Sequence, residues 1–217
     1  MSWTLNAIFS FSILLAAIIG IIRFKNISPN YYPFIFSLWI GSLNEIVSYF
    51  LIRNSVSNAL NGNIYVLIES LLISWQFKKW DAFKNNRWVF EIIIILFVTS
   101  WIIENFFISR ITSFSSYFRV LYSFIIVLIS VNTINELIIR ERRNIMKNSV
   151  FLICTAFIIY YTYKVLVETF WIYGLNYSRG FRNNVYIILT YINLFANLIY
   201  GLAVLWMPTK QRFTLPS

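Results

Sequence analysis

The sequence contains no histidine and only one cysteine, Cys154, which lies inside an apolar run. A single cysteine cannot form a disulfide within the chain. Without histidine the chain also cannot build a His/Cys zinc site, a histidine-ligated haem site or a His-based catalytic triad. The only aspartate, Asp81, lies in a basic connector, so a paired-aspartate membrane protease is excluded as well. These absences predict a protein that is not an enzyme and that holds no metal or cofactor.

Glycine and proline are scarce too, with six and four residues among 217. They form neither a G-x-G-x-x-G motif nor a P-loop, so no nucleotide-binding domain is predicted. Gly20, Gly41 and Gly201 are the only glycines well within predicted helices, and no proline interrupts a helix. The interrupted, ion-coordinating helices of many ion-coupled transporters are therefore not indicated.

Apolar residues, by contrast, are abundant: 59% of the chain is hydrophobic, 12% is charged, and the mean hydropathy is +0.69. A water-soluble domain of this length cannot bury so much apolar surface in one core. Since about 20 helical residues cross a bilayer, the sequence predicts a single all-α domain with seven transmembrane helices in the plasma or inner membrane. The predicted spans are Trp3–Ile22, Tyr32–Ile52, Leu60–Phe77, Trp88–Phe107, Tyr117–Ile139, Asn148–Trp171 and Asn184–Trp206.

Lysine and arginine are unevenly divided between alternate connectors, and positively charged loops tend to stay in the cytoplasm. One set of connectors holds Arg23, Lys25, Lys78, Lys79, Lys84, Arg87, Arg140, Arg142, Arg143, Lys147, Lys210 and Arg212; the other holds Arg53, Arg110, Arg179 and Arg182, with Arg119 at the mouth of the fifth span. This asymmetry predicts the N-terminus outside and the C-terminus inside, with the first span as an uncleaved anchor. Because the net charge of +10 is spread over loops, nucleic acid is not a predicted partner.

Two spans begin with similar segments, which suggests an internal repeat. Asn63-Ile-Tyr65-Val-Leu-Ile opens the third span and Asn184-Val-Tyr186-Ile-Ile-Leu opens the seventh. The match favours two parallel three-helix units joined by the fourth span, a 3+1+3 plan; chance similarity among apolar segments is the alternative. Such a plan resembles that of the seven-helix sugar facilitators and vitamin-precursor transporters, which implies passage of a small solute between two bundles. The resemblance is confined to architecture, because the Pro-Gln turn of the sugar facilitators is absent.

Among the ionisable residues inside predicted spans, where each costs roughly 2.5–3.5 kcal/mol on insertion scales, four need explanation. With a rise of 1.5 Å per residue, Glu45 and Lys164 both lie about 20 Å above the inner boundary. Glu69 falls near the same level, and Glu168 follows Lys164 one turn later on the same helical face. One interpretation is a structural ion pair, in which Lys164 bonds to Glu168, Glu45 or Glu69.

The other interpretation is a polar pocket that opens to the outside, in which the carboxylates bind a cation or hydrogen-bond a neutral solute. Tyr160, Tyr161 and Tyr163 would surround it. Gln76, Asn193 and Asn197 are expected to line the inner half of a solute path. Their alternative role is to join helices, since amides commonly bond between membrane helices.

These patterns predict a small membrane protein that binds or translocates a small polar solute through Glu45, Glu69, Lys164 and Glu168, with Tyr161 beside them. The alternative is a sensor or assembly subunit that signals to a protein partner through its basic inner loops. An enzyme acting on lipid is a third reading that nothing in the spacing favours. Anionic lipid of the inner leaflet is an expected partner of Lys78, Lys79, Arg142 and Arg143.

Overall fold

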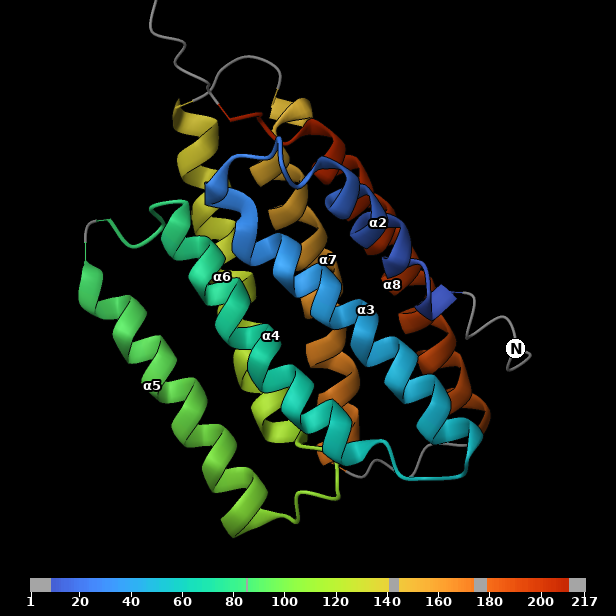
Figure 1. The fold of residues 1–217 in the computed structure, drawn as a ribbon. Helices are drawn as coiled ribbons and strands as arrows, with labels where there is room; N and C mark the ends of the chain where they lie inside the picture. The colour runs from blue at the N-terminus through green and yellow to red at the C-terminus, as the bar shows by residue number, and fades with distance from the viewer. Residues whose placement is uncertain (1–8, 85, 141–144, 174–178, 211–217) are drawn as a thin grey trace, which may run out of the picture.

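The computed structural model describes residues 9–84, 86–140, 145–173 and 179–210, which form a helical bundle (Figure 1). The long helices are α2 (Ile13–Arg23), α3 (Tyr32–Arg53), α4 (Ala59–Lys79), α5 (Arg87–Ile103), α6 (Ser116–Arg140), α7 (Ser149–Ile172) and α8 (Arg179–Trp206). Three short helical turns accompany them: η1 (Pro29–Tyr31), η2 (Glu104–Ile108), which continues α5, and η3 (Ile145–Lys147). Within these ranges there is no β-strand, only an isolated backbone bridge between Ile27 and Thr209.

The prediction of an all-helical chain is confirmed, and each predicted span overlaps one long helix. The bounds of α3, α4, α6 and α7 fall within two residues of the prediction, whereas α8 begins five residues before its predicted start. Residues 1–8, where the first predicted span begins, lie outside the described residues, as do Arg142, Arg143 and Arg212.

In the part of the chain that the structure describes, five helical stretches are long and apolar enough to cross a membrane: Pro29–Arg53, Trp88–Ile108, Ser116–Ile139, Ser149–Ile172 and Asn184–Trp206. α2 is apolar but has only 11 residues. α4 carries Asn63, Glu69 and Gln76, all buried inside the bundle, which lower its mean hydropathy. Among the described residues, length and composition therefore establish five helices able to cross a membrane, and seven crossings stay a prediction.

Six of the helices form a closed ring in which each packs against its neighbours in chain order: α2 on α3, α3 on α4, α4 on α6, α6 on α7, α7 on α8, and α8 back on α2. α5 lies outside this ring against α4 and α6 (Figure 1). Exchanging α2–α4 with α6–α8 leaves the pattern of neighbours unchanged, as the 3+1+3 repeat requires. Any ring followed in chain order has that property, so the repeat stays a prediction.

Consecutive helices run in opposite directions, which places alternate connectors at the same end of the bundle (Figure 1). We call the end that holds residues 54–58 and 109–115 the distal end, and the end that holds residues 24–31 and 80–84 the proximal end. At the proximal end, Pro33 lies in the first turn of α3, where its missing N–H costs nothing. Arg23 donates hydrogen bonds there to the carbonyls of Val204 and Leu205 at the C-terminus of α8, which closes the ring.

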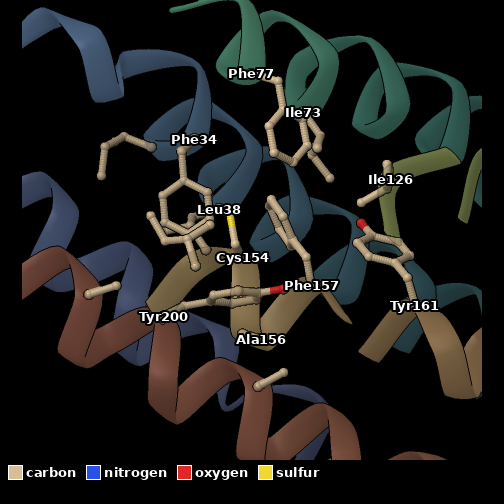
Figure 2. Close-up of a cluster of buried hydrophobic side chains, with 14 of the residues drawn as sticks. Phe34, Leu38, Ile73, Phe77, Ile126, Cys154, Ala156, Phe157, Tyr161 and Tyr200 are labelled. Carbon is tan, nitrogen blue, oxygen red and sulfur yellow. The ribbon is translucent and has the colours of Figure 1, made fainter. Parts of the chain in front are cut away.

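Aromatic side chains fill the middle of the ring (Figure 2). The Phe34 ring of α3 lies 5.4 Å from the Tyr200 ring of α8, centroid to centroid. The Phe157 ring of α7 lies 5.8 Å from Tyr200 and 6.0 Å from the Phe77 ring of α4. Cys154 is fully buried in the same cluster. The interior at this level is packed with side chains, which separate the distal end from the proximal end.

Gly41 of α3 lies where α2 and α4 both approach that helix. A Cβ atom at this position would stand 2.7 Å from Cδ1 of Ile13 and 3.2 Å from the Tyr65 hydroxyl oxygen. Small residues allow membrane helices to pack this closely. The absence of a side chain at Gly41 therefore brings α2, α3 and α4 together.

We expect Gly41→Leu to lower the Tm of the purified protein, because overpacking such a contact costs about 1–3 kcal/mol. Val47→Leu is the matched control: Val47 is 43% exposed on the same helix, so this variant should change the Tm little. Thermal unfolding in detergent, followed by circular dichroism, measures the difference. Equal Tm values for the two variants would contradict the close contact at Gly41.

Candidate functional site

A cavity of about 740 Å³ lies toward the distal end of the bundle, between α3, α4, α6, α7 and α8. This volume falls within the range of small-molecule sites, about 300–1,000 Å³. Its polar lining consists of Asn44, Glu45, Ser48, Asn58, Tyr65, Ser116, Tyr117, Arg119, Tyr160, Lys164, Glu168 and Tyr186, with Phe114 and Trp171 among the apolar residues. The cavity thus combines charged groups with aromatic rings.

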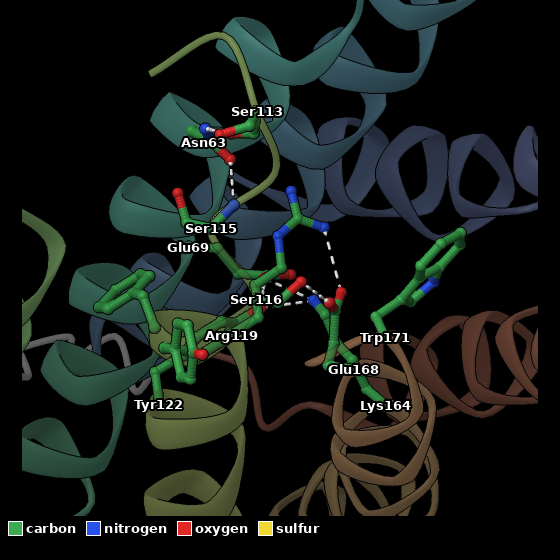
Figure 3. Close-up of polar contacts among 12 residues, drawn as sticks. Asn63, Glu69, Ser113, Ser115, Ser116, Arg119, Tyr122, Lys164, Glu168 and Trp171 are labelled. Carbon is green, nitrogen blue, oxygen red and sulfur yellow. Dashed lines mark hydrogen bonds and ion pairs between the residues drawn. The ribbon is translucent and has the colours of Figure 1, made fainter. Parts of the chain in front are cut away.

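Lys164 of α7 is the most deeply placed cation of the cavity, with 7% of its surface exposed. Its ammonium nitrogen lies 3.7 Å from Oε2 of Glu69 on α4 and donates a hydrogen bond to the Tyr122 hydroxyl of α6 (Figure 3). Tyr122 in turn donates to Glu69 Oε2 at 2.8 Å, and Tyr65 donates to Glu69 Oε1 at 2.8 Å. Both oxygens of the buried carboxylate are therefore satisfied, as a buried charge requires.

A second ion pair joins α6 to α7 nearer the distal end (Figure 3). Nη1 of Arg119 lies 3.5 Å from Oε1 of Glu168, and the Ser116 hydroxyl donates to Glu168 Oε2 at 2.7 Å. The guanidinium carbon of Arg119 stands 5.0 Å from the centre of the Phe114 ring. Gly62 of α4 leaves room for this arginine, because a Cβ there would stand 3.0 Å from Nη2.

Glu45 of α3 lines the same cavity but forms no ion pair with any residue that the structure describes. It interacts electrostatically with Glu69 and Lys164, and its carboxylate is within reach of the Ser10 hydroxyl. The cluster therefore holds three carboxylates and two cations. When all five groups are charged, one negative charge is in excess, and Glu45 carries it.

The structure thus brings together the four ionisable residues that the sequence singles out. Glu45, Lys164 and Glu168 line the cavity, and Glu69 lies behind Lys164. Lys164 pairs with Glu69 across the helices rather than with Glu168, so of the three proposed structural pairings the Glu69 one is present. Tyr161 lies outside the lining, 1% exposed, with its ring centre 5.5 Å from the Lys164 ammonium.

The predicted amides lie away from the cavity. Gln76 joins α4 to the start of α3: its Oε1 accepts from the Phe34 N–H at 2.8 Å, and its Nε2 donates to the Asn30 carbonyl at 2.6 Å. Asn197 of α8 donates to the Ser12 hydroxyl at 2.8 Å and to Asn193 Oδ1 at 3.5 Å. The contacts of Gln76 and the Asn197–Ser12 contact join separate segments, as amides commonly do between membrane helices, whereas the Asn197–Asn193 contact lies within α8. A solute path past Gln76, Asn193 and Asn197 stays a prediction, and the site we describe does not include them.

Other functional groups escape sequence reasoning. Tyr122 carries the link between Lys164 and Glu69, yet nothing distinguishes it from core aromatics in a chain that is 20% Phe, Trp and Tyr. Arg119 was expected only at the mouth of the fifth span. The feature of the sequence that could have indicated its role is its position in the first turn of that span, where an arginine can form an ion pair with an acidic residue of a neighbouring helix.

Two polar networks hold the start of α6 in place beside the cavity. Glu104, 3% exposed, accepts hydrogen bonds from the N–H groups of Tyr117 at 3.0 Å and Phe118 at 2.5 Å, which stabilises the N-terminus of α6. Asn63 of α4 donates to the carbonyl of Ser113 at 2.6 Å and accepts from the N–H of Ser115 at 3.1 Å (Figure 3). The connector before α6 is thereby fixed, and Arg119 with it.

No protein-family model, no curated protein and no solved structure matches this chain.

We expect Lys164→Met to destabilise the protein by about 3–5 kcal/mol, because the buried Glu69 carboxylate then loses its counter-charge. Adding Glu69→Gln should recover more than half of the lost Tm, because the amide oxygen still accepts hydrogen bonds and no charge remains. Lys147→Met, at an exposed lysine of η3, is the control and should leave the Tm unchanged. A Lys164→Met protein as stable as wild type would show that the ion pair is not needed.

Proposed function

We propose that this chain is a membrane protein with seven crossings that binds or translocates a small polar solute through the distal cavity, without catalysing a reaction. The observation that carries the proposal is the cavity itself, about 740 Å³ in volume and lined by Glu45, Arg119, Lys164 and Glu168. These residues lie on helices that are long and apolar enough to cross a membrane. Such charges inside a bilayer typically face a water-filled cavity or a binding site.

Seven crossings are favoured by the positions of α2 and α4. Both helices belong to the same ring as α3 and α8, so they run through the layer that those helices span. Apart from Lys78 and Lys79 at the end of α4, their exposed side chains are apolar: Ile18 and Ile22 on α2 are 53% and 74% exposed, and Leu60 and Ile64 on α4 are each 45% exposed. Apolar residues on the outer side, together with the buried polar residues of α4, fit helices that face lipid outward.

A purely structural role accounts for only part of the cluster. In each of the two ion pairs, Lys164–Glu69 and Arg119–Glu168, the opposite charges neutralise each other. Together the two pairs join three helices. Neither pair needs a cavity beside it, and neither accounts for a third carboxylate at Glu45. A solute that occupies the cavity and interacts with Glu45 accounts for both features.

The positive connectors favour an orientation in which the proximal end is cytoplasmic, so that the cavity opens to the outside of the plasma or inner membrane. A second hollow, of about 620 Å³, lies at the proximal end and is lined by Asn30, Trp75, Lys78, Lys79, Asp81 and Phe90. Two lysines beside a tryptophan are suited to an anionic lipid headgroup. We include inner-leaflet lipid as a partner on this basis.

Cysteine labelling tests both the orientation and the open cavity. Ser57→Cys and Asn44→Cys should react with a membrane-impermeant thiol reagent in intact cells, because one lies in the distal connector and the other lines the cavity. Lys84→Cys, in the proximal connector, should react only after permeabilisation. The unmodified chain is the control, since Cys154 is 0% exposed and should stay unlabelled.

Labelling of Lys84→Cys in intact cells, with Ser57→Cys labelled only after permeabilisation, would show that the orientation is opposite to the one proposed. If Asn44→Cys stays unlabelled while Ser57→Cys reacts, the cavity is not open to the outside and the proposed function fails.

For the lipid contact, we expect Lys78→Gln combined with Lys79→Gln to reduce the phosphatidylglycerol that co-purifies with the protein by severalfold. Each lysine near an anionic surface contributes about 1 kcal/mol. The control is Lys147→Gln, which removes an exposed lysine outside the hollow. Phospholipid content is measured by mass spectrometry after purification in mild detergent, and equal content in both variants would contradict the lipid site.

A further inference from the structure

We propose that the solute of the distal cavity is a small organic cation, an amine or a quaternary ammonium compound, held by Glu45 and by the aromatic rings of the lining. This inference rests on the proposed function and specifies its ligand class.

The charges of the cavity favour a cation. Lys164 is matched by Glu69 at 3.7 Å and Arg119 by Glu168 at 3.5 Å. Glu45 has no such partner among the residues that the structure describes. An anionic solute would have to displace one of the existing carboxylates, whereas a cationic solute meets a carboxylate that is available.

Paired cations do not present a free site to an anion. Nζ of Lys164 donates a hydrogen bond to Tyr122 and lies 3.7 Å from Oε2 of Glu69, and Nη1 of Arg119 lies 3.5 Å from Oε1 of Glu168. Each of the two cations therefore already has a carboxylate counter-charge. Glu45, the carboxylate without a cationic partner among the described residues, stands on the α3 side of the cavity.

The aromatic part of the lining is suited to the same class of ligand. Tyr65, Tyr160, Trp171 and Tyr186 all border the cavity. The faces of such rings attract cations within about 6 Å, and aromatic cages recognise quaternary ammonium groups. The Lys164 ammonium already lies 5.4 Å from the centre of the Tyr160 ring, so this lining accommodates a cation next to an aromatic ring.

The size and the donor set of the cavity favour an organic cation over a bare metal ion. A volume of about 740 Å³ is that of a small-molecule site. The described ranges contain no group of three or more Cys, Asp or Glu side chains able to hold a metal ion. An organic cation uses one carboxylate and several rings, which is what the cavity offers.

Choline and 3,3-dimethyl-1-butanol test the proposal, because the alcohol has the same shape with a carbon in place of the charged nitrogen. Binding of each to the full chain in lipid nanodiscs is measured by calorimetry and by the rise in Tm. We expect choline to bind at least about tenfold more tightly than the alcohol. Glu45→Gln should remove that preference, and Glu91→Gln, at an exposed acid on α5 outside the cavity, should retain it.

Equal affinity for choline and the alcohol would overturn the cation assignment and leave the solute site intact. No measurable binding of either compound would also overturn it, and labelling of Asn44→Cys then decides the proposed function separately. The comparison on the unmodified chain does not depend on whether Glu45→Gln folds. Retention of the full choline preference by a folded Glu45→Gln protein would show that Glu45 is not the recognition group.

Discussion

The contact between the Lys164 ammonium and the Glu69 carboxylate is the constraint on which the rest of the bundle depends. A charge removed from water is tolerated only where an opposite charge and hydrogen-bonding groups compensate it. Tyr65 and Tyr122 complete this compensation at the two carboxylate oxygens. Because the groups come from α4, α6 and α7, their contact fixes the depth and rotation of three helices at once. The cavity lies on the distal side of this contact.

α4 supplies much of the polar bonding between helices, because its buried face carries a polar side chain at three positions along its length. Asn63 binds the connector before α6, Glu69 binds Tyr122 of α6, and Gln76 binds the start of α3. These groups would be costly against lipid, and each is satisfied inside the ring. The aromatic cluster around Phe157 fills the middle of the ring, and the cavity lies on its distal side.

Much of the fold follows from local pattern. The lengths of the apolar segments predict α3, α4, α6 and α7 to within two residues, because hydrophobic length and polar connectors are local properties. The fixed rise of a helix also places Glu45, Glu69 and Lys164 at one depth. Lys164 does pair with Glu69, and Glu45 lines the same cavity as Lys164. The sequence is a poorer guide to which charged residues form ion pairs with each other. Lys164 and Glu168 stand one turn apart on α7, yet they take partners on α4 and α6.

By itself, the sequence determined that the chain is helical, that several helices are apolar enough for a membrane, and that a few charges lie deep within them. Only the tertiary structure decided which charged residues form ion pairs, and that Glu45 has no cationic partner among the described residues. It also decided that Gln76 and Asn197 form hydrogen bonds to neighbouring segments and do not line the cavity. The physical reason is that residue spacing fixes positions along one helix. Contacts between helices depend on how each is rotated against its neighbours, and packing of the whole ring sets that rotation.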